Sequence, residues 1–268
     1  MSTVVFVGTL AGLLLSLGWL LGGLDGLAGG AVLSILLLGS GRAYGQQALL
    51  KLTHARPLQD PRVERMLVKI AYEAKILVPR LYLAPMAIQN AFSTGSSEGN
   101  AGIIVSEGLL ALPDDELAAV LAHEVAHIKH GDMAVYTLAA FLMAPLSRAA
   151  AWGHLQLNED RRRNFLGILV MAPAAAVASF FVRMATERER EYRADWTGAL
   201  LLRKPEAMAS AVRMLTASAR QRPVRGVPST SHLWFVNPFP TSWLHSLFTA
   251  HPEAERRIER LEVLAPLG

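Results

Sequence analysis

The segment His123-Glu124-Val125-Ala126-His127 is the most informative part of this sequence, because it places two imidazoles and a carboxylate at the spacing that a catalytic metal needs. Residues four apart lie one above the other on one face of an α-helix, so His123 and His127 can bind the same ion. Glu124 is rotated by about 100° and can reach a water molecule beside that ion. The pattern predicts a metal-dependent hydrolase. The alternative is a helix with buried, hydrogen-bonded histidines, in which a glutamate after the first histidine has no packing purpose.

The residues on either side favour a long helix that packs inside a domain. Leu112-Pro113-Asp114-Asp115-Glu116-Leu117 has the features of a helix start, with proline in the first turn and three acids near the positive end of the helix dipole. Gly131 then ends the helix. Between the two ends runs a stripe of apolar side chains that can hold the helix rigidly: Leu117, Val120, Leu121, Val125 and Ile128.

A catalytic zinc has three protein ligands and leaves a fourth position for water, so a third ligand is needed. The metzincin pattern H-E-x-x-H-x-x-G-x-x-H would supply a third histidine. This sequence has His130 and Met133 where that pattern needs glycine and histidine, so the metzincin reading does not fit. His130 lies on nearly the same helix face as His123, but the break at Gly131 favours a supporting or surface role for it.

The other common solution is a glutamate on a later helix, supported four residues further on by an aspartate that hydrogen-bonds a ligand imidazole. Glu187, Glu189 and Glu191 are the candidates. Only Glu191 is followed at that spacing by an aspartate, Asp195. The alternative is that this charged segment is a solvated helix face. We predict that one Zn²⁺ per chain has three ligands: His123, His127 and Glu191.

The composition indicates a membrane protein. The chain has 268 residues, of which 52% are hydrophobic, with no cysteine and a net charge of +4. Its first forty residues contain one acid, Asp25, and no base. Thr3–Leu24 and Leu27–Tyr44 are each long and apolar enough for a bilayer crossing, and we predict a transmembrane hairpin. A cleaved signal sequence is the alternative, but no basic residue precedes Val4.

The basic residues orient this hairpin. Those that follow it are Arg42, Lys51, Arg56, Arg62, Arg65 and Lys69. By the positive-inside rule they place the chain after the hairpin in the cytoplasm. Because they cluster around hydrophobic segments, anionic lipid headgroups are a simpler partner than nucleic acid.

Two more apolar segments, Met133–Trp152 and Asn164–Val182, lie between the histidines and Glu191. Residues that bind one ion must be separated by an even number of membrane crossings. These segments therefore form a second hairpin or lie together at the membrane interface. Buried core helices of a soluble domain are the alternative.

The sequence between the first hairpin and the histidine helix predicts a small α+β domain. Val63–Lys75 has helical periodicity, and three β-leaning segments follow it: Arg80–Ala84, Ala91–Gly95 and Ala101–Ser106. A peptide can add to an exposed sheet edge through its main chain. The predicted substrate-side residues are therefore Asn90, Ala91 and Phe92, with an ordinary strand and turn as the alternative. Near the C-terminus, Glu253–Leu264 has the pattern of a short amphipathic helix.

Several motifs together resemble a known family. They are Asn90-Ala91-Phe92-Ser93-Thr94-Gly95, Ala122–Ile128 with Gly131-Asp132-Met133, Arg190-Glu191-Tyr192-Arg193-Ala194-Asp195, and His251-Pro252 with Arg257-Ile258. In this order and spacing they resemble the HtpX family of membrane-embedded zinc metallopeptidases. The hydrophobic pairs and Leu233-Trp234-Phe235-Val236-Asn237-Pro238 are also similar to that family, so the resemblance spans nearly the whole chain.

The resemblance implies a mainly α-helical fold with a small β-sheet, that is, an α+β catalytic domain of the gluzincin type, plus transmembrane helices. It implies Glu124 as the catalytic base of an endopeptidase that degrades misfolded or damaged membrane proteins, as stress-response quality control. The expected location is the inner membrane of a bacterium, multi-pass, with the active site in the cytoplasm. We expect four parts: a transmembrane hairpin (1–45), the first part of the catalytic domain (46–132), a second hydrophobic hairpin (133–182) and the second part of the catalytic domain (183–268).

One motif departs from the family pattern. Where the family commonly has Thr-His-Pro-Pro, this chain has Ala250-His251-Pro252-Glu253. His251 is the candidate for steadying the oxyanion of the reaction, and a structural loop histidine is the alternative.

Other functions also stay open. A membrane scaffold with a structural metal is one, although the chain lacks cysteines and a fourth ligand. A processing enzyme similar to the CAAX prenyl proteases is another, although the chain has too few hydrophobic segments for their many-helix chamber. The metal chemistry alone does not exclude a hydrolase that acts on bonds other than peptides.

Overall fold

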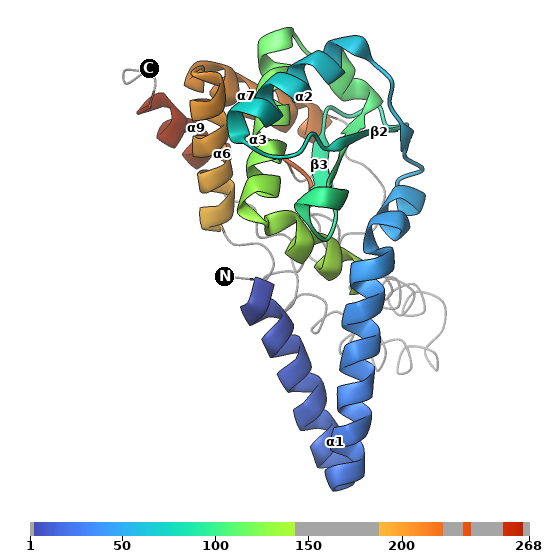
Figure 1. The fold of residues 1–268 in the computed structure, drawn as a ribbon. Coiled ribbons are helices and arrows are strands. Elements are labelled where there is room, and N and C mark those ends of the chain that lie inside the picture. The colour runs from blue at the N-terminus through green and yellow to red at the C-terminus, as the bar shows by residue number, and fades with distance from the viewer. Residues whose placement is uncertain (1–2, 143–187, 222–232, 237–253, 265–268) are drawn as a thin grey trace, which may run out of the picture.

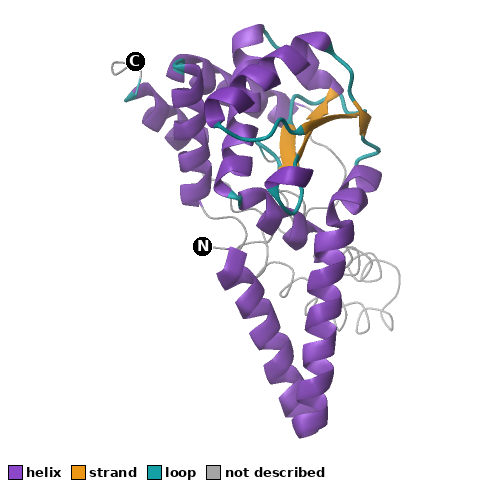
Figure 2. Ribbon diagram, in the orientation of Figure 1, coloured by secondary structure: helices purple, strands orange, loops and turns teal. Residues whose placement is uncertain are grey.

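The structure is a computed structural model that describes residues 3–142, 188–221, 233–236 and 254–264. It is mainly helical with one small sheet (Figure 2), which confirms the predicted fold class. A long pair of helices at the N-terminus projects from a body formed by the remaining elements (Figure 1).

Helix α1 (Thr3–Leu52) is two helices joined at a sharp kink. Gly22 and Gly23 have non-helical backbone angles there, and Gly23 has a φ of 56°, which glycine adopts without strain. The two arms form a narrow V (Figure 1). They approach so closely that a Cβ on Gly26 would lie 2.0 Å from the carbonyl oxygen of Gly18. The turn of this hairpin therefore lies at Gly22 and Gly23, at the end of the first predicted crossing, Thr3–Leu24.

Both arms of α1 keep large apolar side chains exposed, including Leu20 at 79%, Leu24 at 74% and Ile35 at 71% exposure. Within the described residues, α1 is the one helix long and apolar enough to cross a membrane. An apolar surface of this extent is expected to contact lipid. The helix therefore fits a membrane anchor.

The sheet has the order β1-β2-β4-β3. Its strands are β1 (Arg56–Pro57), β2 (Arg80–Ala84), β3 (Ala91–Thr94) and β4 (Gly102–Ser106). Strands β2 and β4 are parallel, whereas β1 pairs antiparallel with β2 and β3 pairs antiparallel with β4. The three predicted strands are confirmed. Strand β1 was not predicted, because two residues cannot show an alternating pattern. Strand β3 lies at an edge of the sheet.

Helix α2 (Pro61–Ala74) begins where the Asp60 side chain accepts hydrogen bonds from the backbone N–H groups of Arg62 and Val63. Short 3₁₀ helices, η1 (Glu98–Asn100) and η2 (Glu107–Ala111), flank β4. Both α2 and the next long helix confirm the sequence-based expectations.

Helix α3 (Asp114–His130) forms the centre of the body. It ends at Gly131, whose φ of 74° is a left-handed conformation suited to glycine. One face of α3 packs against α2 and β3, and another packs against α6 (Arg188–Leu202) and α7 (Pro205–Gln221). Helix α9 (Ala254–Glu262) covers α6 and α7 and confirms the predicted C-terminal amphipathic helix.

The first of the two later apolar segments is only partly described. Residues Asp132–Leu142 form an apolar helix. It packs against the second arm of α1, where a Cβ on Gly41 would lie 2.4 Å from Leu138 and one on Gly45 would lie 3.0 Å from Thr137. The remainder, 143–187, lies outside the described residues, so the second hairpin stays a prediction.

Candidate metal centre

Helices α3 and α6 bring the three predicted ligands to one point. His123 and His127 lie one turn apart on α3, with their Nε2 atoms 3.0 Å from each other. Glu191 reaches them from α6, with Oε2 3.6 Å from Nε2 of His123 and Oε1 3.5 Å from Nε2 of His127. All three side chains are buried. Two imidazole nitrogens and one carboxylate that face one another are a donor set suited to a divalent metal ion.

Glu191 has the features of a ligand. Its Oε2 atom is buried and has no hydrogen-bond partner among the described residues. Burial acts to raise the pKa of this carboxyl, but the imidazoles of His123 and His127 hold it well below its usual range. The group is therefore an anion whose Oε2 has ion-pair contacts, to Nε2 of His123 at 3.6 Å and Nη1 of Arg257 at 3.8 Å, but no hydrogen bond. A bound cation would satisfy this atom. Tyr136, on helix Asp132–Leu142, donates a hydrogen bond of 3.4 Å to its Oε1.

The Asp195 carboxylate holds His123 in place. Its Oδ1 lies 2.9 Å from Nδ1 of His123, which leaves Nε2 directed at the metal position. Arg257, on α9, grips the same carboxylate with two hydrogen bonds of 2.7 Å. Burial acts to raise the pKa of Asp195, but the Arg257 charge lowers it. The predicted contact between Asp195 and a ligand histidine is present, and α9 fixes it from outside.

A second carboxylate holds His127. Asp132, two residues after the end of α3, has Oδ2 3.3 Å from Nδ1 of His127. Arg190 and Arg193 on α6 donate to Asp132 at 3.1 and 3.2 Å. Burial acts to lower the pKa of His127, but Asp132 and Glu191 raise it to about 10. A metal at Nε2 would therefore displace a proton from His127.

Asp132 and Arg257 were not assigned roles from the sequence. Both stand in the motifs that carry the family resemblance, Gly131-Asp132-Met133 and Arg257-Ile258, and that position was the available signal. Phe235 was also missed. The centre of its ring lies 4.5 Å from that of His123 and 4.6 Å from the guanidinium carbon of Arg257.

Glu124 lies beside the ligands on α3. It is 1% exposed, and neither carboxylate oxygen has a hydrogen-bond partner among the described residues. Burial raises the pKa of this carboxyl, whereas the imidazoles of His123 and His127 act in the opposite direction. A buried carboxyl without a partner is costly to the fold. Its position is suited to taking a proton from a water molecule at the metal.

The predicted substrate-side residues lie at the start of β3 and are buried. A short segment, Leu233–Val236, covers them: Phe235 N–H donates to the Ala91 carbonyl at 3.0 Å. The Asn90 side chain donates to the Val236 carbonyl at 2.6 Å. Phe92 packs its ring against Trp234, with centroids 4.7 Å apart. The outer edge of β3 is therefore occupied at Ala91.

His130 and His251 are two further histidines that the sequence analysis considered for the site. His251 lies outside the described residues, so its part in the reaction stays a prediction. His130 does not belong to the group of side chains close enough to share an ion, and its Nε2 lies 3.4 Å from the hydroxyl of Thr197. This agrees with the expectation that it does not bind the metal.

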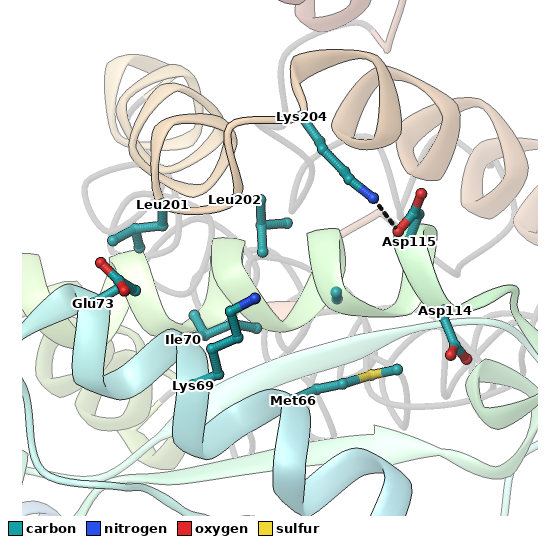
Figure 3. Close-up of a pocket in the computed structure, with 10 residues that line it drawn as sticks. Met66, Lys69, Ile70, Glu73, Asp114, Asp115, Leu201, Leu202 and Lys204 are labelled. Atoms are coloured by element: carbon teal, nitrogen blue, oxygen red, sulfur yellow. Dashed lines mark hydrogen bonds and ion pairs between the residues drawn. The ribbon is translucent and has the colours of Figure 1, made fainter. Parts of the chain in front are cut away.

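A separate pocket of about 240 Å³ lies between α2, the start of α3 and the end of α6 (Figure 3). Lys69 and Met66 of α2 face it, and Lys204 closes it with a hydrogen bond of 2.7 Å to Asp115. Asp115 precedes His123 by about two helical turns, so this pocket is distinct from the metal centre.

The fold and the site define a class of protein. One helix carries two histidines and a glutamate, and a later helix carries a glutamate ligand with its supporting aspartate. A small sheet packs beside the first of these helices. These are the features of an HExxH metallopeptidase whose third metal ligand is a glutamate. Comparison with known proteins then gives the family. Residues 57–265 match peptidase family M48, and the chain belongs to that family.

Its relatives include two proteins that are each described as a protease HtpX homolog. The one from Syntrophobacter fumaroxidans is 36% identical, over 97% of this chain and 97% of the relative. The one from Pyrococcus abyssi is 35% identical, over 98% of this chain and 95% of the relative. The resemblance to the HtpX family is thus confirmed, as is the enzyme class.

One solved structure shows the same fold. The crystal structure of S. mikatae Ste24p aligns with a TM-score of 0.53 at 18% sequence identity. The alignment covers 96% of this chain and 63% of that chain.

Proposed function

We propose that this protein is a membrane-bound zinc endopeptidase that cleaves misfolded or damaged membrane proteins as part of protein quality control. One observation carries the proposal. The facing atoms of His123, His127 and Glu191 surround a position next to the unpaired Glu124, in a chain whose α1 presents an apolar surface.

The donor set favours zinc in a catalytic role. Structural zinc is held by four protein ligands, often thiolates, whereas catalytic zinc keeps one position open. Among the described residues, the group of His, Asp and Glu side chains close enough to share an ion has three members, and the sequence has no cysteine. A bound Zn²⁺ would supply Lewis acidity, which makes water more acidic and polarises a carbonyl group.

The protein's own residues would perform the proton transfers. Glu124 would take a proton from the attacking water and pass it to the nitrogen of the leaving amine. The carboxylates of Asp195 and Asp132 would keep both imidazoles in the tautomer with Nε2 free for the metal. His251 stays our proposed donor to the oxyanion.

The edge of β3 would align the substrate. An extended peptide pairs with an edge strand through its main chain, with little dependence on side chains, which suits an enzyme for misfolded proteins. Asn90, Ala91 and Phe92 stay the proposed substrate-side residues. The Ala91 carbonyl already accepts from Phe235, so a peptide would pair there only after Leu233–Val236 moves, or it would pair further along β3.

The site would face the cytoplasm of a bacterial cell, at the inner membrane. The basic residues at the end of the second arm of α1 and directly after it support this orientation, since such residues stay on the cytoplasmic side. A site next to the bilayer would meet segments of membrane proteins as they leave it.

The proposal is tested with the full chain in detergent, as wild type and as Glu124→Gln, on an unfolded soluble protein and on a destabilised membrane protein. We expect cleavage by the wild type only, equal zinc content in both proteins, and loss of wild-type cleavage with a chelator. Cleavage by Glu124→Gln at the wild-type rate would overturn the role of the base. Firmly bound zinc without cleavage by the wild type would favour a scaffold with a structural metal.

A further inference from the structure

The main chain of β3 has a fixed orientation. The N–H of Ser106, on β4, donates to the Asn90 carbonyl. The main-chain carbonyl of Asn90 therefore points toward β4. Because hydrogen-bonded pairs alternate along an antiparallel ladder, the main chains of Ala91 and Ser93 face the outer edge. The bond from Phe235 to the Ala91 carbonyl agrees with this assignment. Ser93 is the next position on the same edge.

The side chains of β3 alternate between two faces of the sheet. Ala91 belongs to the hydrophobic cluster that includes the buried residues of α3, whereas Phe92 belongs to the second cluster with Trp234. Ser93, two residues from Ala91, therefore directs its side chain to the α3 side. Strand β3 packs directly on α3, which carries Glu124.

The Ser93 hydroxyl is buried without a partner. Ser93 is 1% exposed, and its Oγ makes no hydrogen bond with any described residue. Its neighbours are different: the Thr94 hydroxyl pairs with that of Thr137 at 3.1 Å. Ser106 Oγ donates to the Ile88 carbonyl at 2.5 Å. An unsatisfied buried hydroxyl costs stability, and alanine at this position would avoid the cost.

A second buried group without a partner among the described residues lies on the other side of the interface between β3 and α3. Both oxygens of Glu124 are also buried and unpaired. Glu124 lies on α3 and the Ser93 side chain lies on the α3 side of β3, and these two elements are in direct contact, so both unpaired groups belong to one buried interface. In agreement with this, the Ser93 hydroxyl acts to lower the Glu124 pKa that burial raises.

We propose that Ser93 is a positioning residue of the active site, whose hydroxyl donates a hydrogen bond to the Glu124 carboxylate in the metal-loaded enzyme. This bond would hold the carboxylate in the orientation that proton transfer needs. The inference rests on the proposed function, because it takes Glu124 as the base. It adds a group from the edge strand to the proton-transfer apparatus.

The test uses the full chain in detergent with zinc, as wild type, Ser93→Ala, Ser93→Thr and, as a matched control, Ser106→Ala. We expect Ser93→Ala to lower kcat about tenfold or more with KM and zinc content within about twofold, since support of this kind is worth roughly ten- to hundredfold. Ser93→Thr keeps the hydroxyl and should restore most of kcat. Ser106→Ala should lower the midpoint of thermal unfolding but not kcat per folded molecule.

A second readout does not depend on activity. In protein carrying isotope-labelled glutamate, infrared difference spectra identify the carboxylate band that disappears in Glu124→Gln. This band should shift in Ser93→Ala and stay in place in Ser106→Ala. An unmoved band, or full kcat in Ser93→Ala while Glu124→Gln is inactive, would overturn the role of Ser93 alone. If the wild type does not cleave, the proposed function is wrong. The shift of the infrared band in Ser93→Ala would still show whether Ser93 bonds to the Glu124 carboxylate.

Discussion

Each of the two ligand imidazoles is held by its own buried carboxylate. Asp195 holds His123 and Asp132 holds His127, and in both cases the bond is to Nδ1. Arginines neutralise both carboxylates, with Arg257 on Asp195 and Arg190 and Arg193 on Asp132. This arrangement fixes Nε2 of both rings before the metal arrives, which lowers the cost of binding it.

Loss of one supporting carboxylate should weaken metal binding. We expect Asp195→Ala to reduce zinc affinity roughly ten- to hundredfold, because His123 would lose the partner that orients it. Competition with a chromophoric chelator measures the affinity. Asp115→Ala, which removes an exposed ion pair with Lys204, is the control and should leave zinc affinity unchanged. Equal affinities in the two variants would contradict the supporting role of Asp195.

Loss of Arg257 should destabilise the protein. Its side chain is 3% exposed, and Arg257→Met would leave the buried Asp195 charge without its partner. Breaking a buried pair in this way costs about 3–5 kcal/mol. Arg260→Met removes an exposed arginine of the same helix, with a side chain 57% exposed, and should cost about 1 kcal/mol or less. Thermal unfolding in detergent compares the stability of the two variants. Equal unfolding midpoints for Arg257→Met and Arg260→Met would contradict the stabilising role of Arg257.

At the level of elements, the site depends on how closely α6 lies against α3. Gly198 on α6 makes this approach possible. A Cβ at Gly198 would lie 2.6 Å from Cε of Met208 and 3.0 Å from the backbone nitrogen of His123. The same helix carries Glu191 and Asp195, so the approach sets their distance from the histidines.

A side chain at Gly198 should therefore disturb the metal centre. We expect Gly198→Ala to push α6 away from α3, to cost about 1–3 kcal/mol in stability and to weaken zinc binding. Unfolding midpoints and chelator competition measure the two effects. Gly99→Ala is the control, because a Cβ at Gly99 would meet nothing within 4 Å. Wild-type zinc affinity in Gly198→Ala would show that the close approach does not matter.

At the level of the whole molecule, the hairpin and the body would face different environments. Leu24, at the tip of the hairpin, is exposed and apolar. Ser97 is exposed on the body. If the two arms of α1 cross a bilayer, these positions lie on opposite sides of it.

Single cysteines can test this orientation, because the natural sequence has none. In cells treated with a membrane-impermeant thiol reagent, we expect Leu24→Cys to react and Ser97→Cys to react only after the membrane is broken. Labelling of both in intact cells, or of Ser97→Cys alone, would rule out a cytoplasmic site. A Ser97→Cys protein in broken cells serves as the control for reactivity.

The sequence by itself determined the parts of the site that lie within one element. Residues four apart lie on the same face of a helix, so the sequence alone places His123 next to His127 and Glu191 next to Asp195. The apolar N-terminal helices and β2, β3 and β4 were also predictable, since their patterns repeat along the chain. The position of the kink in α1, at Gly22 and Gly23, was not assigned from the sequence, because this part of the chain contains several glycines.

Only the tertiary structure decided how distant segments meet. Asp132 approaches His127 after the chain turns at Gly131, and Arg257 reaches Asp195 from a separate helix. The segment at Phe235 covers the edge of β3 in the same way. Such contacts depend on the packing of whole elements, which no local spacing encodes. The ligands and Asp195 could therefore be found in the sequence, whereas the roles of Asp132, Arg257 and Phe235 could not.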